Sequence, residues 1–156
     1  MTPSPTRILG IGNSILGDDA VGLHAARRLR DLVPPGVSVL EAECGGIALV
    51  EFLAGCRRAF VLDAMVCRDA EPGTVVRAGL GELWASPRLG SAHDVTLDTV
   101  VRLGQEYGFQ MPEELVVYGI QIHPARVFSE ALTPAAEVGV QRAVTRVLTE
   151  LRTGSS

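Results

Sequence analysis

Short apolar runs alternate along this chain with stretches in which apolar residues recur at helical spacing. Runs typical of strands lie at residues 7–12, 37–43, 58–65, 71–79 and 114–122. Helical spacing recurs over residues 18–33, 47–55, 91–108 and 133–151. The pattern therefore predicts strands and helices that alternate along nearly the whole chain.

This alternation predicts an α/β fold. We expect a three-layer sandwich, in which a mostly parallel, twisted sheet of about five strands carries helices on both faces. The segment 71–79 reads as a turn followed by an edge-like strand. The length of 156 residues fits a single domain over 1–156, with a core at about 7–151 and a frayed tail at 152–156.

Residues that begin and end helices support these boundaries. Asp18 or Asp19 is a plausible start of the first helix, and the Pro-Pro-Gly at 34–36 ends it. Thr133 is the expected N-cap of the last helix, with Pro134 at its first position. Within the helix at 91–108, the face predicted to be apolar consists of Val95, Val100, Leu103 and Tyr107.

Composition narrows the class of partner. The formal net charge is -4, and the basic residues are scattered, which argues against nucleic acid because phosphate binding needs a basic face. No stretch approaches the roughly 20 apolar residues that span a bilayer. The start of the chain has no apolar segment of secretory length. We therefore expect a cytoplasmic protein that does not bind membranes.

The cysteines predict no disulfide framework. Cys44, Cys56 and Cys67 are an odd number and show no C-x-x-C spacing, so a zinc knuckle is not expected either. Small buried thiols in a reducing compartment are the simplest interpretation.

The candidate chemistry lies where the predicted strands end, because ligands of such folds bind beyond the carboxyl ends of the strands. The polar residues there are Asn13, Asp18, Asp19, Glu41, Glu43, Asp63, Gln121 and His123, and His93 opens the helix before the last strand. The edge of the sheet is thus expected to be rich in carboxylates.

Nucleotide binding does not fit this edge. Gly10 and Gly12 match the first part of a G-x-G-x-x-G fingerprint, but Ile15 occupies the position of the third glycine. The acidic pair then stands where a pyrophosphate would approach a helix N-terminus. There is also no G-x-S-x-G nucleophile elbow and no cysteine clearly matched to a histidine, so serine or cysteine protease chemistry is disfavoured.

A divalent metal ion fits better. Two carboxylates and the His93 imidazole form an O/O/N ligand set suited to nickel, zinc, cobalt or manganese, with positions left open for water or substrate. Structural roles stay open as alternatives. Asp18 or Asp19 serves equally as a helix cap, Asp63 as a paired strand-end acid, and His93 as an ordinary first-turn residue. His24 is expected to be a solvated or packing residue, and His123 is a second candidate ligand.

The ordered motifs resemble those of the hydrogenase maturation endopeptidases, which process the large subunit of nickel-iron hydrogenases. The opening motif matches at Gly10, Gly12, Asn13, Ile15, Leu16, Gly17, Asp18, Asp19 and Gly22. "FVLDAM", "EPGTV", "SAHDVTL" and "VYGIQ" with "FSEALTPAAEVGV" resemble later family segments, so that the likeness covers about residues 7–150. The segment 41–46 departs from the family's D-G-G-T-x-G loop, which leaves the type of hydrogenase open.

The resemblance implies a function and a site. The expected activity is that of an aspartyl-type endopeptidase that removes the C-terminal extension of a hydrogenase large-subunit precursor after nickel insertion. Asp19, Asp63 and His93 carry over as catalytic and metal-binding residues. The metal is expected to be the nickel carried by the precursor, with cadmium or zinc as substitutes, and no Ser or Cys nucleophile is expected. The alternatives are a metal- or ligand-binding α/β module without peptidase activity and a hydrolase of the nucleoside-phosphorylase kind.

Overall fold

A five-stranded sheet forms the middle layer of the structure, a computed structural model that describes residues 5–67, 69–79, 96–123 and 129–153. The strands are β1 (Thr6–Ile11), β2 (Val37–Ala42), β3 (Arg58–Met65), β4 (Val75–Gly79) and β5 (Glu114–Gln121). Their order across the sheet is β2-β1-β3-β5-β4. The first four in this order run parallel, and β4 pairs antiparallel with β5 at the edge. The predicted α/β class and the edge position of β4 are confirmed.

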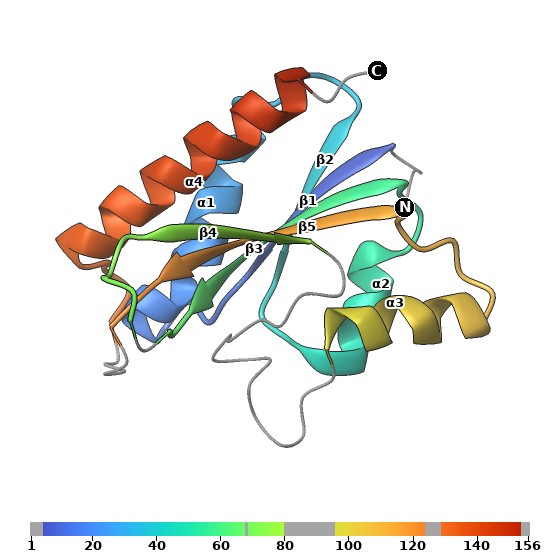
Figure 1. Ribbon diagram of the computed structural model, residues 1–156, viewed down its shortest axis with the longest axis horizontal. Coiled ribbons are helices and arrows are strands. Elements are labelled where there is room, and N and C mark those ends of the chain that lie inside the picture. Colours follow the sequence, from blue (N-terminus) through green and yellow to red (C-terminus); the bar gives the residue numbers. More distant parts are fainter. Residues whose placement is uncertain (1–4, 68, 80–95, 124–128, 154–156) are drawn as a thin grey trace.

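Helices cover both faces of the sheet (Figure 1). They are η1 (Gly17–Ala20), α1 (Val21–Arg30), η2 (Gly46–Ala48), α2 (Leu49–Leu53), α3 (Leu97–Glu106) and α4 (Pro134–Thr153), where η marks a 3-10 helix. α1 and α4 lie on one face, and α2 and α3 lie on the other (Figure 1). This arrangement is the predicted three-layer sandwich.

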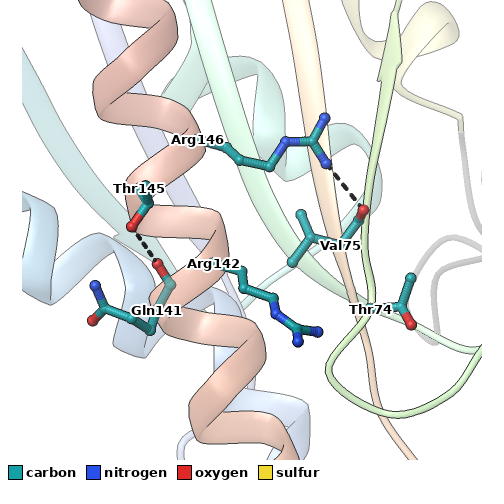
Figure 2. A pocket seen from close by; sticks show the side chains of 6 residues that line it. All are labelled: Thr74, Val75, Gln141, Arg142, Thr145 and Arg146. Carbon is teal, nitrogen blue, oxygen red and sulfur yellow. Dashed lines mark hydrogen bonds between the residues drawn. The ribbon is translucent and has the colours of Figure 1, made fainter.

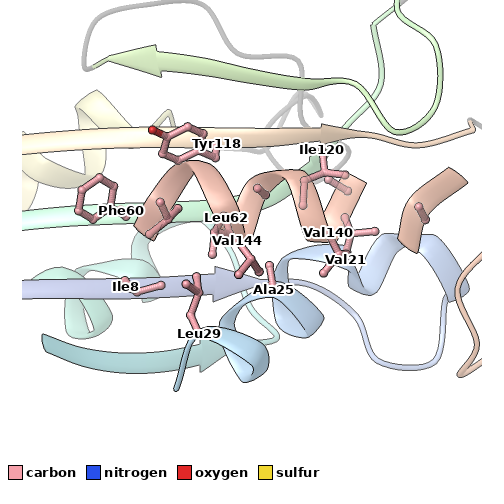
Figure 3. Packing of buried hydrophobic residues seen from close by; sticks show 14 of the residues in the cluster. Ile8, Val21, Ala25, Leu29, Phe60, Leu62, Tyr118, Ile120, Val140 and Val144 are labelled. Atoms are coloured by element: carbon pink, nitrogen blue, oxygen red, sulfur yellow. The ribbon is translucent and has the colours of Figure 1, made fainter. Parts of the chain in front are cut away.

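Each face has its own apolar core because alternate side chains of a strand point to opposite faces. Ile8, Phe60 and Tyr118 pack beneath α1 and α4, as Figure 3 shows. Leu9 and Val61, one position further along their strands, pack beneath α2 and α3. β1 and β3 are buried on both sides, which explains why they appear in the sequence as continuous apolar runs.

Several helix boundaries differ from the prediction. α1 ends at Arg30 rather than at residue 33, and Leu32, which continues the apolar pattern, is 55% exposed. α3 begins at Leu97, where the Thr96 side chain accepts a hydrogen bond from the backbone N–H of Thr99. His93, which was predicted to open this helix, lies outside the described residues. Tyr107 follows the last helical residue and is 80% exposed, so its predicted place on the apolar face is wrong.

The end of the chain agrees better with the sequence. α4 begins at Pro134, and the Thr133 hydroxyl accepts a hydrogen bond from the backbone N–H of Ala136 at 3.3 Å, as expected for an N-cap. α4 continues through Thr153, two residues into the segment predicted to fray.

The cysteines are free thiols; Cys56 is buried, whereas Cys44 and Cys67 are half-buried. None of the helices within the described residues combines the length and the apolar character needed to cross a membrane.

Candidate active site

Three glycines bring the start of α1 against the carboxyl ends of β1 and β3. A Cβ atom on Gly22 would lie 2.3 Å from the carbonyl oxygens of Ile11 and Leu62, closer than real atoms approach. A Cβ atom on Gly10 would lie 2.3 Å from the carbonyl oxygen of Gly22, and one on Gly12 would lie 2.8 Å from Cγ of Leu23. The G-x-G pattern therefore serves close helix–sheet packing, and it places η1 in contact with β3.

Two acids are buried at this junction. Asp19 on η1 is 3% exposed, and Asp63, close to the carboxyl end of β3, is fully buried. The Asp63 Oδ1 atom accepts a hydrogen bond of 2.8 Å from the backbone N–H of Ala64. Burial of carboxylates is costly unless positive charge or hydrogen bonds compensate it. The structure thus buries two acids on contacting elements, η1 and β3.

The other member of the acidic pair, Asp18, has a structural partner. Its Oδ1 accepts a hydrogen bond of 2.8 Å from the backbone N–H of Thr133, and its Oδ2 accepts one of 2.7 Å from the Thr133 hydroxyl. The side chain of neither acid caps η1 or α1. The predicted capping of the first helix is therefore wrong, and Asp18 instead fastens the N-terminus of α4.

A second long-range contact supports the loop after β1. The backbone N–H of Gly17 donates to the carbonyl oxygen of Ser129 at 2.7 Å, and the N–H of Ser129 donates to that of Ile15 at 2.9 Å. Leu16 and Ser129 thus form an isolated parallel bridge. Ser129 holds this loop through its backbone, so its residue type does not predict the contact.

Polar residues after β1 and β2 hold the same loop. Glu43 Oε1 accepts a hydrogen bond of 2.8 Å from the backbone N–H of Ser14. The Asn13 side-chain oxygen accepts one of 3.2 Å from the N–H of Ile15, as in an Asx turn. Glu41 lies elsewhere, in ion pairs with two arginines of α1.

Gln121 positions the loop after β3. It lies beside Met65 in the sheet, and its side chain is buried. Its Oε1 accepts a hydrogen bond of 2.8 Å from the backbone N–H of Cys67, and its Nε2 donates one of 2.9 Å to the carbonyl oxygen of Ile122. The Cys67 sulfur lies 3.9 Å from that of Met65. Sequence reasoning located Gln121 at this edge but did not foresee this supporting role.

Of the three histidines, His24 and His123 lie within the described residues. His93 lies outside the described residues. His24 is half-buried on α1, where burial and then the neighbouring Arg27 lower its pKa, which favours the neutral imidazole. His123 follows β5 and is exposed. Within the described residues, no group of three His, Cys, Asp or Glu side chains is arranged to hold a metal ion. The described part of the predicted site is the pair Asp19 and Asp63.

Comparison with known proteins identifies the class. A model of the hydrogenase maturation protease family (HycI) matches residues 23–150. The hydrogenase 2 maturation protease of Escherichia coli K12 is 28% identical over 148 residues, which are 93% of this chain and 89% of that protein. The hydrogenase expression/formation protein HupD of Rhodobacter capsulatus is 26% identical over 96% of this chain and 72% of its own length.

Solved structures agree with the fold. The hydrogenase maturating endopeptidase HybD from E. coli superposes with a TM-score of 0.77 and 24% identity, over 99% of this chain and 94% of that one. The [NiFe] hydrogenase maturation protease HybD from Thermococcus kodakarensis gives a TM-score of 0.68 and 25% identity, over 96% and 98%. The chain belongs to the hydrogenase maturation protease family.

Proposed function

We propose that this protein removes the C-terminal extension of a nickel-iron hydrogenase large-subunit precursor after nickel has been inserted. Asp19, Asp63 and His93 bind the nickel that the precursor carries. The burial of Asp19 and Asp63 on contacting elements is the observation that carries this proposal, together with membership in the protease family. The proposal places the reaction in the cytoplasm.

The ligand atoms of Asp19, Asp63 and His93 support nickel as the bound metal ion. Carboxylate oxygens and an imidazole nitrogen suit borderline divalent ions, and cadmium or zinc are expected to occupy the same ligands. A bound divalent ion supplies Lewis-acid chemistry beside the scissile carbonyl. The residues of this chain position the precursor: Asp19 is held by η1, and Asp63 by the end of β3.

If the protein recognises the precursor through its nickel ion, it cleaves only precursors in which nickel has been inserted. Buried carboxylates are stabilised by a divalent cation beside them, so nickel in the precursor favours formation of the complex. A precursor without nickel lacks the cation that these carboxylates are proposed to bind, and we expect it to bind poorly and to stay uncleaved. Membership in a protease family favours peptidase activity over the alternative, a ligand-binding module without peptidase activity.

The decisive experiment mixes the purified protein with the cognate precursor, with and without nickel, and records intact masses. We expect a discrete C-terminal mass loss with the nickel-loaded precursor alone. Asp63→Asn, Asp19→Asn and His93→Ala are expected to slow this loss by at least about 100-fold while the proteins remain folded.

Asp18→Asn is the matched control, because Asp18 is the neighbouring acid and its oxygens contact Thr133 instead. An asparagine retains one acceptor for that contact, so processing is expected to continue at a rate close to that of the wild type. A folded Asp63→Asn protein with full activity contradicts the proposed site. An unchanged mass with the cognate, nickel-loaded precursor contradicts the peptidase activity and supports the ligand-binding module.

A further inference from the structure

A cleft of about 480 Å³ lies between α4 and the start of the edge strand β4 (Figure 2). Its lining residues are Thr74, Val75, Gln141, Arg142, Thr145 and Arg146. Two arginines one helical turn apart point from α4 toward the strand (Figure 2). None of the six lining residues is acidic.

Both guanidinium groups are held in place by backbone carbonyls. Arg142 Nη1 donates a hydrogen bond of 3.1 Å to the carbonyl oxygen of Gly73, and Arg146 Nη1 donates one of 3.0 Å to that of Val75. The Arg146 guanidinium also lies 5.2 Å from the centre of the Tyr118 ring. A guanidinium has five N–H donors, so these contacts fix each group while leaving donors for a ligand.

The positive charge of this pair is not compensated by an ion pair within the described residues. Arg27, Arg28, Arg30, Arg57, Arg58 and Arg77 each form an ion pair with a glutamate. Glu150, one turn beyond Arg146, is occupied by both Arg77 and the Tyr118 hydroxyl. On a chain whose net charge is -4, the cleft is therefore locally cationic.

The register of the sheet relates this cleft to the acidic pair. Val75 pairs with Ile120, and Ile120 pairs with Ala64, the residue that follows Asp63. Val75 thus lies level with the end of β3, two strands away, which is roughly 10 Å across the sheet. The Asp63 side chain points to the α2 and α3 face, because its neighbours Leu62 and Ala64 pack beneath α1 and α4, so a bound polypeptide reaches from the cleft to the acids around the ends of the strands.

We propose that the cleft binds the carboxylate of an acidic residue in the precursor polypeptide. This inference rests on the proposed function, because it takes the precursor as the occupant. A guanidinium group can hold a carboxylate through two parallel hydrogen bonds, and charge complementarity favours an acidic segment over a neutral one. Arg142 and Arg146 are specificity residues in this view, and they do not take part in the cleavage.

The first test measures binding without any cleavage. The ¹⁵N-labelled protein is titrated with acetyl-Gly-Glu-Glu-Gly-amide, with the Gln-Gln analogue, and with inorganic phosphate, while backbone and arginine side-chain signals are recorded. We expect the glutamate peptide to shift the signals of Thr74, Val75, Thr145 and both cleft arginines. These shifts are expected to disappear in the Arg142→Gln/Arg146→Gln protein, whose helical circular dichroism should match that of the wild type because both side chains are exposed.

The second test uses the processing reaction. The Arg142→Gln/Arg146→Gln protein is expected to raise KM for the precursor by about fivefold to tenfold with kcat unchanged. Arg102→Gln is the control, because Arg102 is an exposed arginine of α3 on the other face of the sheet. Its KM is expected to equal that of the wild type.

Several results overturn the inference. Equal shifts with the glutamine peptide, or shifts with phosphate alone, exclude a carboxylate peptide site. An unchanged KM in the double variant excludes a role in binding the precursor. If the wild type cleaves no precursor, the proposed function fails, whereas the peptide titration still decides whether the cleft binds carboxylates.

Discussion

Arg7 shows how a single buried charge organises this fold. Its side chain is fully buried at the start of β1. Its Nη1 donates to the carbonyl oxygens of Phe52 at 2.9 Å and Ala54 at 2.6 Å, and its Nε donates to the Ser38 hydroxyl at 3.2 Å. The guanidinium thereby satisfies the carbonyls at the end of α2, which no following helical turn can do.

We predict that Arg7→Met lowers the free energy of unfolding by about 2–4 kcal/mol, because buried carbonyl oxygens lose their donor. Urea denaturation followed by circular dichroism measures this change. Arg102→Met, at an exposed position of α3, is the control and is expected to change stability by less than about 0.5 kcal/mol. Equal stabilities of the two variants would show that Arg7 contributes nothing through these hydrogen bonds.

At the scale of elements, the packing of α1 on the sheet depends on the absence of a side chain at one position. Gly22 lies in the first turn of α1 between the ends of β1 and β3. The same contact sets the position of η1, and with it the position of Asp19.

Gly22→Ala is therefore predicted to destabilise the protein by at least about 3 kcal/mol, since the new methyl group collides with two backbone carbonyls. Gly36→Ala is a useful comparison. Gly36 has a φ of 93°, and a Cβ atom added there would meet nothing within 4 Å, so only conformational strain of about 1–2 kcal/mol is expected. Thermal unfolding of both variants measures the difference, and a Gly22→Ala protein as stable as Gly36→Ala would contradict the close-packing explanation.

The sequence predicted the bounds of an element correctly where the hydrophobic pattern allows only one placement of its ends. The predicted and observed bounds of β3 are the same. Its apolar run is buried on both faces, begins at Arg58 and ends two residues after Asp63. The start of α3 was missed because several residues before it are equally good caps, and the structure uses Thr96. Asp63 was predictable as the acid near a strand end. The separate role of Asp18 was not, because its partner Thr133 lies 115 positions away in the sequence.

At the scale of the whole molecule, a polar network joins β5, α4 and β4. The Tyr118 hydroxyl donates to Glu150, which also accepts two hydrogen bonds of 2.9 Å from Arg77. Burial, and then the hydrogen bond to Glu150, raise the pKa of Tyr118 to about 12. The hydrogen bonds from Arg77 lower the pKa of Glu150.

This network predicts how stability depends on alkaline pH. The unfolded chain loses the Tyr118 proton near pH 10, whereas the folded protein retains it to about pH 12. The stabilisation of the folded protein by the protonated Tyr118 is complete below about pH 10 and is lost as the pH rises toward about 12. We expect the wild type to lose roughly 1–3 kcal/mol over this interval, and Tyr118→Phe to lose much less. Urea denaturation at pH 8 and pH 11 measures the difference.

Tyr107→Phe provides the comparison, because Tyr107 is largely exposed. Its alkaline loss of stability is expected to equal that of the wild type. If Tyr118→Phe declines as steeply as Tyr107→Phe, the alkaline sensitivity arises elsewhere in the molecule.

The contact between Asp18 and Thr133 has a consequence for synthesis of the chain. The acidic loop follows the first strand, but its anchors, Ser129 and Thr133, are translated near the end. β5, which completes the parallel part of the sheet, also comes late. In a nascent chain on the ribosome, Asp19 and Asp63 are therefore synthesised well before the residues that position the acidic loop. The arrangement of Asp19 and Asp63 becomes available only when the whole polypeptide has been made, so an unfinished protein exposes no organised site.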